Sequence, residues 1–383
     1  MKRRRFVQGL GMTGLAPVLA ACSRIFRIPI DVMARPEPAP DGDRDPDGVW
    51  SEAAAYARWT PSPHNIQPWR LHLLSATEAE LYADPHRLLP VTDPTSAFTI
   101  AGLGMFVEYL SVAMQSRGYE ITADYENKPL DYTVDRPILF ARLRRVAFRG
   151  DATWDRQLIL ERKTSRLPYD GAVVDDEALQ RLARIAGEQG HTFSWSSDAA
   201  LVQWTVDLNR FTLFSDLDDA PTRGELRKWI RTTDAEAARS KDGLWSHCLR
   251  FPGWVLKDFF DAHSTWGKGW RADLCGKLLV RGMRGTRTVA WFSGPFDRPD
   301  DWIRAGVLMS RSWLELTKRG IGLHPFGSII TNTAAHARLR EKLGPQRGAD
   351  QLWMLIRLGR SDAPPRSYRL DEHAIFITAR ELA

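Results

Sequence analysis

The sequence predicts an α+β fold that consists of two successive halves. The apolar periodicity gives helix, strand, strand, helix, strand and strand in the first 150 residues, and a related series then begins again. The 383 residues are 43% hydrophobic and 26% charged, which is typical of a folded chain and excludes disorder. We therefore expect an internal duplication, with halves at 49–150 and 151–383 and mixed sheets flanked by helices.

The first half begins with helical spacing and continues with alternating patterns. The predicted elements are a helix at 49–59, strands at 71–74 and 80–83, a long apolar helix at 96–117, and strands at 119–125 and 138–146. Small residues at Ala101, Gly102 and Gly104 indicate that the long helix packs closely against a neighbour.

The second half contains longer helices. The predicted elements are helices at 153–162, 177–189, 199–214 and 222–239, strands at 191–195 and 286–293, a helix at 299–319 with Gly306 facing a neighbour, and a buried strand at 352–358. No apolar run reaches the ~20 residues that a membrane span requires, so we expect no transmembrane helix.

Residues 240–285 fit neither half and are rich in aromatic and basic side chains. Four tryptophans lie there among lysines and arginines. One interpretation is an amphipathic helical insertion that packs on the body. The others are a lid over a planar ligand and a membrane-facing patch. Cys248 and Cys275 also lie in this segment, and whether they pair is left open.

The N-terminus has the pattern of an export signal. Four basic residues at 2–5 precede a weakly apolar stretch, which is typical of a cleavable signal at 1–21. Its Arg-Arg-Phe-Val order resembles a twin-arginine signal, and residues 19–22 resemble a bacterial lipobox with Cys22 as the lipidated residue. The resemblance implies passage through the twin-arginine translocon and a periplasmic, membrane-anchored lipoprotein. Residues 22–48, rich in Pro and Asp, are predicted as a tether.

Charge and composition exclude several classes of function. The formal net charge is +6, but residues 1–21 contribute four positive charges and no acid, so the remainder carries only +2. A nucleic-acid partner therefore has no support. Three cysteines exclude a four-cysteine zinc site, and the nine scattered histidines form no metal motif, so no metal is expected.

A rigid polar segment follows the first helix. Residues 61–69 read Pro-Ser-Pro-His-Asn-Ile-Gln-Pro-Trp, in which short polar side chains are held by three prolines. Asn65 and Gln67 offer both donors and acceptors, which suits the edge of a heteroaromatic ring, although an ordinary capped loop has the same composition. The run resembles the Pro-Ser-x-x-Asn-x-Gln-Pro-Trp segment of the FMN-dependent nitroreductase family. The resemblance implies that Ser62, Asn65 and Gln67 contact the flavin ring.

A basic cluster opens the second half. Arg162, Thr164 and Arg166 place two guanidinium groups around a hydroxyl, a pattern that binds phosphate but also occurs at solvated helix ends. It resembles the family's Arg-x-Ser-x-Arg element, which implies a role in holding the FMN phosphate and ribityl chain.

Two further elements resemble the same family. Gly320 and Gly322 lie in a turn that resembles the family's glycine turn beside the flavin, although a helix C-cap explains them equally. Beyond the last strand, Arg366 or Arg369 is expected to supply a basic group to the phosphate, and the sequence does not choose between them.

The resemblance implies an exported FMN-binding oxidoreductase that passes hydride or electrons to a nitroaromatic or quinone-like acceptor. We predict no catalytic side chain, because the flavin N5 performs the chemistry. Outside the cytoplasm NAD(P)H is absent, so the donor is expected to be a quinol or a redox protein. The alternative is an envelope protein that binds FMN without turnover, for storage or redox sensing.

The order of the motifs also predicts one FMN per chain. Ordinary members of the family are dimers with two flavins, whereas this chain carries the ring segment in its first half and the phosphate elements in its second. A reciprocal site would need an Asn-x-Gln turn after Arg166, where residues 168–171 stand instead.

Overall fold

The computed structural model describes residues 39, 42–263, 269–348 and 350–382. The predicted export signal, Cys22 and most of the predicted tether lie outside the described residues, and so does Trp266 of the predicted insertion.

The first half forms one four-stranded antiparallel sheet, a short helix and a long helix. Its elements are α2 (Val49–Ala57), β1 (Trp69–Leu73), β2 (Glu78–Ala83), α3 (Ala97–Gln115), β3 (Tyr119–Tyr125) and β4 (Ile138–Ala147). The strand order is β1-β2-β4-β3. Buried and half-buried positions alternate along β2, because one face of the sheet packs on the core.

The second half repeats this arrangement. Its elements are α4 (Gln157–Glu161), α5 (Asp176–Glu188), β5 (Thr192–Ser196), β8 (Thr288–Gly294), α13 (Pro299–Lys318), β9 (Gly322–Pro325) and β10 (Gln351–Gly359). The strand order β5-β8-β10-β9 is again antiparallel throughout. In both sheets the order is therefore first, second, fourth and third along the chain. The predicted α+β class is confirmed.

Two helices join the halves through a close contact. α3 packs against α13, and their residues belong to one hydrophobic core that continues into both sheets. A Cβ at Gly306 would lie 2.2 Å from the carbonyl oxygen of Ala101, so only glycine allows this approach. Of the described helices, α3 is long and apolar enough to cross a membrane, and 78% of its most apolar stretch is buried in the fold. It is the central helix of the core.

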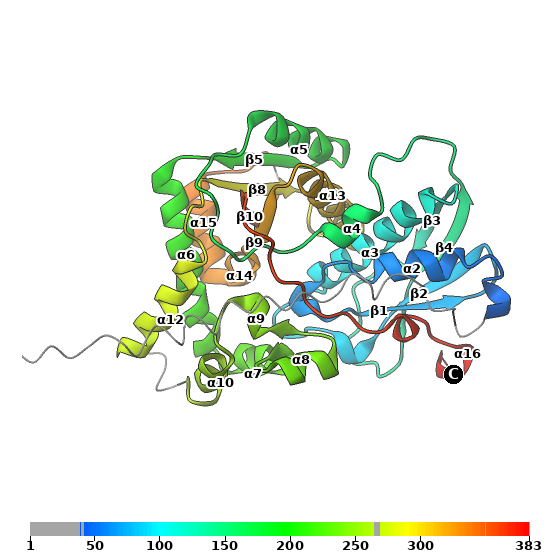
Figure 1. Cartoon of the computed structure of the whole chain (residues 1–383), viewed down its shortest axis with the longest axis horizontal. Coiled ribbons are helices and arrows are strands. Elements are labelled where there is room, and N and C mark those ends of the chain that lie inside the picture. The colour runs from blue at the N-terminus through cyan, green and yellow to red at the C-terminus, as the bar shows by residue number, and fades with distance from the viewer. Residues whose placement is uncertain (1–38, 40–41, 264–268, 349, 383) are drawn as a thin grey trace, which may run out of the picture.

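An arm of the chain runs along one edge strand of each sheet. After β4 the chain crosses to the second half, where Ser165 donates its N–H to Leu323 O over 3.0 Å, beside the edge strand β9. After β10 the chain returns along the first half to α16 (Ala379–Leu382), and Ile377 donates to Leu71 O of the edge strand β1 over 3.0 Å (Figure 1). The two arms cover the edge strands β1 and β9 and carry the predicted phosphate-binding arginines.

A large insertion joins β5 to β8, where the first half has only a short turn. It contains α6 (Ala199–Asp218), α7 (Ala220–Trp229), β6 (Ile230–Arg231), α8 (Asp234–Ser240), β7 (Leu244–Trp245), α9 (Ser246–Leu249), α10 (Gly253–Asp261) and α12 (Gly269–Arg281). It is longer than the predicted 240–285, because the predicted helices at 199–214 and 222–239 belong to it. A shorter excursion, α14 (Gly327–Thr331) and α15 (Thr333–Leu343), separates β9 from β10 and was not predicted.

The end of the predicted tether is docked on the body. Asp45 is buried and accepts from Trp50 N at 3.0 Å and from Ser51 N at 2.9 Å, so it caps the first turn of α2. Ala39 N donates to Ser51 Oγ at 3.0 Å. The described part of the predicted tether, Ala39 and 42–48, therefore lies against the body.

Cys248 and Cys275 are both free and buried, so the disulfide that the sequence left open is absent between them. Within the described ranges, no group of three or more His, Cys, Asp or Glu side chains is placed to bind a metal ion.

Candidate functional site

The loop between α2 and β1 has a strained backbone. His64, Asn65 and Gln67 have φ values of 47°, 56° and 53°, in the left-handed region that non-glycine residues rarely adopt. Such strain persists only where the surroundings determine the conformation, and it occurs preferentially at functional sites. Prolines at 61, 63 and 68 limit the alternative conformations of the loop.

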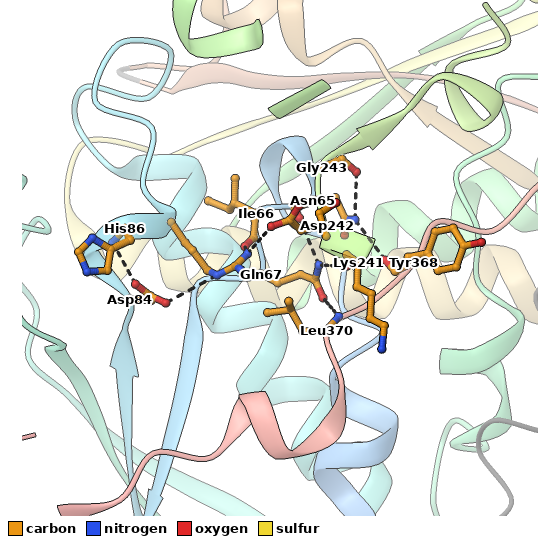
Figure 2. Close-up of polar contacts among 12 residues, drawn as sticks. Asn65, Ile66, Gln67, Asp84, His86, Lys241, Asp242, Gly243, Tyr368 and Leu370 are labelled. Carbon is orange, nitrogen blue, oxygen red and sulfur yellow. Dashed lines mark hydrogen bonds and ion pairs between the residues drawn. The ribbon is translucent and has the colours of Figure 1, made fainter. Parts of the chain in front are cut away.

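Two amides hold this loop against two distant segments. The fully buried Gln67 donates from Nε2 to Lys241 O at 3.0 Å and accepts at Oε1 from Leu370 N at 2.9 Å. Asn65 donates from Nδ2 to Gly243 O at 3.1 Å and to Tyr368 O at 3.2 Å. Figure 2 shows both side chains between the insertion and the C-terminal arm. They therefore join three parts of the chain.

Asn65 retains one free acceptor. Its Nδ2 faces two carbonyl oxygens, which identifies that atom as the nitrogen of the amide. Its Oδ1 is buried and has no hydrogen-bond partner among the described residues. A buried acceptor without a partner costs about 1–3 kcal/mol. It therefore indicates a donor supplied by a ligand or water.

A basic cavity of about 80 Å³ lies beside this loop. It is lined by Trp59, Pro61, Ser62, Asn65, Arg162, Lys163, Thr164, Arg166, Leu244, Cys248, Pro365, Arg366, Ser367 and Arg369. The loop after α2, both arms and the insertion all contribute to it. The structure thus brings the predicted ring-binding motif together with the two predicted phosphate-binding segments, which lie about 100 and 300 residues away from it in the sequence.

Several guanidinium nitrogens in this cavity have no partner. Nε and Nη1 of Arg162, Nε and Nη2 of Arg366 and Nε of Arg369 are buried without hydrogen bonds in the described part of the chain. Arg357 is different: its nitrogens donate to His324 Nδ1, Thr286 Oγ1, Ser165 O and Leu167 O at 2.9–3.2 Å. Arg357 therefore anchors the first arm, whereas the other three offer donors to a ligand.

The cavity is strongly electropositive. No acidic side chain of the described residues lies within ion-pair distance of Arg162, Arg166, Arg366 or Arg369. Burial, with Arg162 and Arg58 nearby, lowers the pKa of Arg366 to about 10. Burial, with Arg162, Arg366 and Arg58 nearby, also lowers the pKa of Arg369. An anion would relieve this repulsion and satisfy the donors, and a phosphate accepts from guanidinium groups bidentately.

A second, mainly apolar cavity of about 510 Å³ adjoins the basic one. Both are lined by Pro61, Ser62, Thr164, Arg166 and Leu244. Its other walls come from α3, α13, β9 and the insertion. Its volume is that of a site for a drug-sized molecule, for which the range is about 300–1,000 Å³. The pair of cavities therefore fits a ligand with an anionic end and an apolar end.

Two neutral histidines line the larger cavity. Burial lowers the pKa of His64 to about 4, and its Nδ1 is buried without a partner in the described chain. His324 accepts at Nδ1 from Nε of Arg357, over 3.1 Å. Because that arginine remains protonated, the proton of His324 is on Nε2. Burial, followed by Arg357, lowers the pKa of His324 and keeps the ring neutral.

The predicted residues divide into three groups. Ser62, Thr164 and Arg166 line both cavities, and Asn65, Arg162, Arg366 and Arg369 line the basic one. Gln67, Gly320 and Gly322 line neither. Gly320 is an exposed helix end with φ 66°, and a Cβ at Gly322 would lie 3.1 Å from Ser165 Cβ. The glycines therefore serve chain geometry, and Gln67 serves as a clamp.

Sequence reasoning missed Trp59 and His324. The guanidinium groups of Arg366, Arg58 and Arg369 lie 4.0, 5.4 and 5.5 Å from the centroid of Trp59, which places this ring at the centre of the arginine cluster. Its position directly before the Pro61 loop was the available signal. The signal for His324 was its place in the predicted glycine turn.

Comparison with known proteins gives distant similarity. No protein-family model matches the chain. The chain is 25% identical over 299 residues to the probable NAD(P)H nitroreductase PigM of Serratia sp., covering 74% of this chain and 81% of that protein. It is 26% identical over 323 residues to the uncharacterized protein Rv3127 of Mycobacterium tuberculosis, covering 80% and 84%.

Solved structures of low overall similarity also match. One is a nitroreductase with bound FMN from Desulfitobacterium hafniense, with 14% identity and a TM-score of 0.32 over 55% of this chain and 91% of that one. Another is the FMN-dependent nitroreductase NfnB from Mycobacterium smegmatis in complex with NADPH, with 18% identity and a TM-score of 0.33 over 56% and 92%.

Proposed function

We propose that the chain is an FMN-dependent oxidoreductase of the nitroreductase type, which reduces an electron-poor small molecule. The observation that carries the proposal is the set of unpartnered guanidinium nitrogens at the narrow end of two adjoining cavities. The similarity to PigM, a probable NAD(P)H nitroreductase, supports it.

The donor groups match the parts of FMN. Arg162, Arg366 and Arg369 would hold the phosphate, with Thr164 beside them. Asn65 Oδ1, which has no hydrogen-bond partner among the described residues, would accept a hydrogen bond from a ribityl hydroxyl. The larger cavity, which adjoins the basic one at Ser62, would hold the ring. When bound, the flavin supplies reversible hydride chemistry at its N5.

The chain's own contribution is orientation and exclusion of water. His324 is a neutral donor at Nε2 in the wall of the larger cavity, because Arg357 occupies its other nitrogen. A donor held in this way can hydrogen-bond a carbonyl or nitro oxygen without losing its proton. Apolar residues of the insertion form the opposite wall and limit the entry of water.

The topology supports the proposal of a single FMN per chain. The strained turn occupies the 11 residues between α2 and β1, at 58–68. The corresponding connection in the second half, between α5 and β5, has only three residues, at 189–191. That connection, rather than 168–171, is the position where a reciprocal ring segment belongs. It is too short to form one.

The donor, acceptor and location belong to the same proposal. NAD(P)H is named for PigM, and a nitroaromatic or quinone is an acceptor class that a mainly apolar cavity suits. If the chain is exported through its twin-arginine signal and anchored at Cys22, a quinol or a redox protein replaces NAD(P)H. A chain that binds FMN without turnover remains the second candidate, favoured by the cover that the insertion forms.

The test is the visible spectrum of the full chain refolded with excess FMN, followed by reduction of the bound flavin. We expect flavin bands at one FMN per chain, and reoxidation by nitroaromatic or quinone acceptors under anaerobic conditions. Absence of flavin bands would contradict the proposal. Reoxidation by oxygen alone would favour the binding function.

A further inference from the structure

We call the end of the larger cavity at Ser62, Pro63 and Gly102 the ring site, because the flavin ring is proposed to lie there. The same cavity extends from the ring site to a region beneath the insertion. We name this part the annex, and its walls include Leu226 of α7, Leu256, Phe259 and Phe260 of α10, and Leu279 of α12. Most of these side chains belong to a separate hydrophobic cluster of the insertion. The annex is therefore a feature of the inserted helices and has no counterpart in the first half.

The annex is continuous with the ring site. The same cavity is lined by Ser62, Pro63 and Gly102 at the loop after α2 and by Phe259 and Phe260 beneath α10. A molecule that stacks at the ring site can therefore extend a substituent into the annex without leaving the protein interior.

The annex offers few polar contacts to a ligand. Thr212 Oγ1 and Ser328 Oγ lie 3.0 Å apart, and Asp216 accepts from Asn332 Nδ2 at 2.7 Å. The polar side chains that line this part of the cavity (Asn209, Thr212, Asp216, Thr222, Ser328 and Thr331) are not among the described side chains that are buried without a partner, in contrast to the arginines of the basic cavity. His263 Nδ1 is such an atom, but His263 packs behind Phe259 and does not line the cavity. Such a lining selects a chain of apolar carbon atoms, because each buried CH₂ group contributes about 0.8 kcal/mol and no polar group is required.

The outer side of the same helices carries exposed tryptophans. Trp254 of α10 is 59% exposed and Trp270 of α12 is 68% exposed, whereas Leu256 and Cys275 on these helices line the cavity. Exposed tryptophan side chains are typical of surfaces that meet a membrane interface. A ligand that dissolves in lipid would thus meet the protein at the helices that enclose the annex.

We propose that the annex binds the apolar side chain of a lipid-soluble quinone, in its oxidised or reduced form, while the quinone ring lies at the flavin site. The inference rests on the proposed function and deepens it, because it names the class of redox partner. It assigns the insertion a role in selecting quinones that carry an alkyl or prenyl chain.

The test compares two quinones with the same ring, one with a decyl chain and one with a methyl group. Binding to the full FMN-loaded chain is followed by quenching of protein fluorescence, and the KM of each quinone as acceptor is measured in parallel. We expect the decyl quinone to bind at least about tenfold more tightly, because each buried CH₂ contributes about fourfold.

Substitutions within the annex provide the second measurement. Leu256→Trp fills the annex, and Leu226→Phe narrows it with a smaller change of volume. Both should reduce the advantage of the decyl quinone and leave FMN content and binding of the methyl quinone unchanged. Val173→Trp, at a position 47% exposed and outside the cavity, is the control and should change none of these.

The outcomes separate the two proposals. Full flavin bands with equal affinity for both quinones overturn this inference and leave the proposed function intact. Flavin bands that are absent in the parent chain overturn the proposed function. If both Leu256→Trp and Leu226→Phe still bind the decyl quinone more tightly than the methyl quinone, the alkyl chain lies outside the annex. That result also overturns the annex assignment.

Discussion

The guanidinium carbon of Arg366 lies 4.0 Å from the centroid of the Trp59 ring, and this stacking holds Nε and Nη2, which have no hydrogen-bond partner among the described residues, in the wall of the basic cavity. The ring orients the guanidinium group without consuming any of its donors. Arg366 is thus positioned for an anion before the anion arrives, in a cavity where no described acid competes for it.

Arg366→Gln should weaken FMN binding by about 10- to 100-fold, since hydrogen bonds to charged groups contribute about 1.5–3 kcal/mol. Stability of the protein without FMN should not fall, because the variant removes a buried charge that repels its neighbours. Flavin fluorescence titration and urea unfolding measure the two quantities. Arg149→Gln, at an exposed position, is the matched control. Unchanged FMN affinity in Arg366→Gln would remove this arginine from the site.

Gln67→Leu should lower the free energy of unfolding by about 2–4 kcal/mol, because Leu370 N and Lys241 O lose their buried partner. Urea unfolding without FMN is the measurement. The exposed Gln203→Leu should change stability by less than about 0.5 kcal/mol. If Gln67→Leu keeps its stability but alters the spectrum of bound flavin, the ring contact predicted from the motif is correct and the clamp is wrong.

Gly306→Ala should destabilise the chain by about 1–3 kcal/mol or more, because its methyl group would lie 2.2 Å from Ala101 O, within the contact between α3 and α13. Gly187→Ala is the control on α5, where no atom lies within 4 Å of the added carbon. That change should stabilise by about 0.5–1 kcal/mol through helix propensity. Equal effects in thermal unfolding would mean that the two long helices are farther apart than the structure places them.

His64 should make the FMN-free protein less stable in mild acid. Its pKa is about 4 in the fold against 6.5 when exposed, so the unfolded chain binds more protons between these values. Stability therefore falls as the pH decreases from about 6.5 to about 4. Asp93, whose pKa burial raises to about 6, acts in the opposite direction.

His64→Gln should reduce the slope of stability against pH in that range, while the contribution of Asp93 stays the same in both proteins and cancels in the comparison. Urea unfolding at several pH values gives the slopes. Identical slopes would show that His64 is hydrated or protonated in the fold.

Local patterns predicted most elements of both sheets, because alternation and helical spacing are properties of neighbouring residues. The sequence also placed Gly306 at a helix contact, which the structure confirms. It did not predict β9, whose four residues pair only with the distant β10. It also underestimated the length of the insertion, because amphipathic helices have the same sequence pattern whether they cover a core or enclose a cavity.

The sequence predicted which residues lie near the candidate site better than it predicted what each of them contacts. Motif residues at 62–67 and 162–166 lie together as expected, but the separate tasks of Asn65 and Gln67 depend on the backbone of Gly243, Tyr368 and Leu370. Hydrogen bonds to backbone atoms cannot be recognised from residue types, because every residue has a backbone carbonyl. Trp59 was missed for a similar reason, since its three arginine neighbours come from both ends of the fold.

The position of the two arms within one chain affects how the site behaves at low protein concentration. A binding site whose walls come from separate chains falls apart on dilution, whereas here peptide linkage keeps the 58–68 loop and both arginine-bearing arms at a fixed effective concentration. Retention of the cofactor should then be independent of how many copies are present, down to a single isolated molecule.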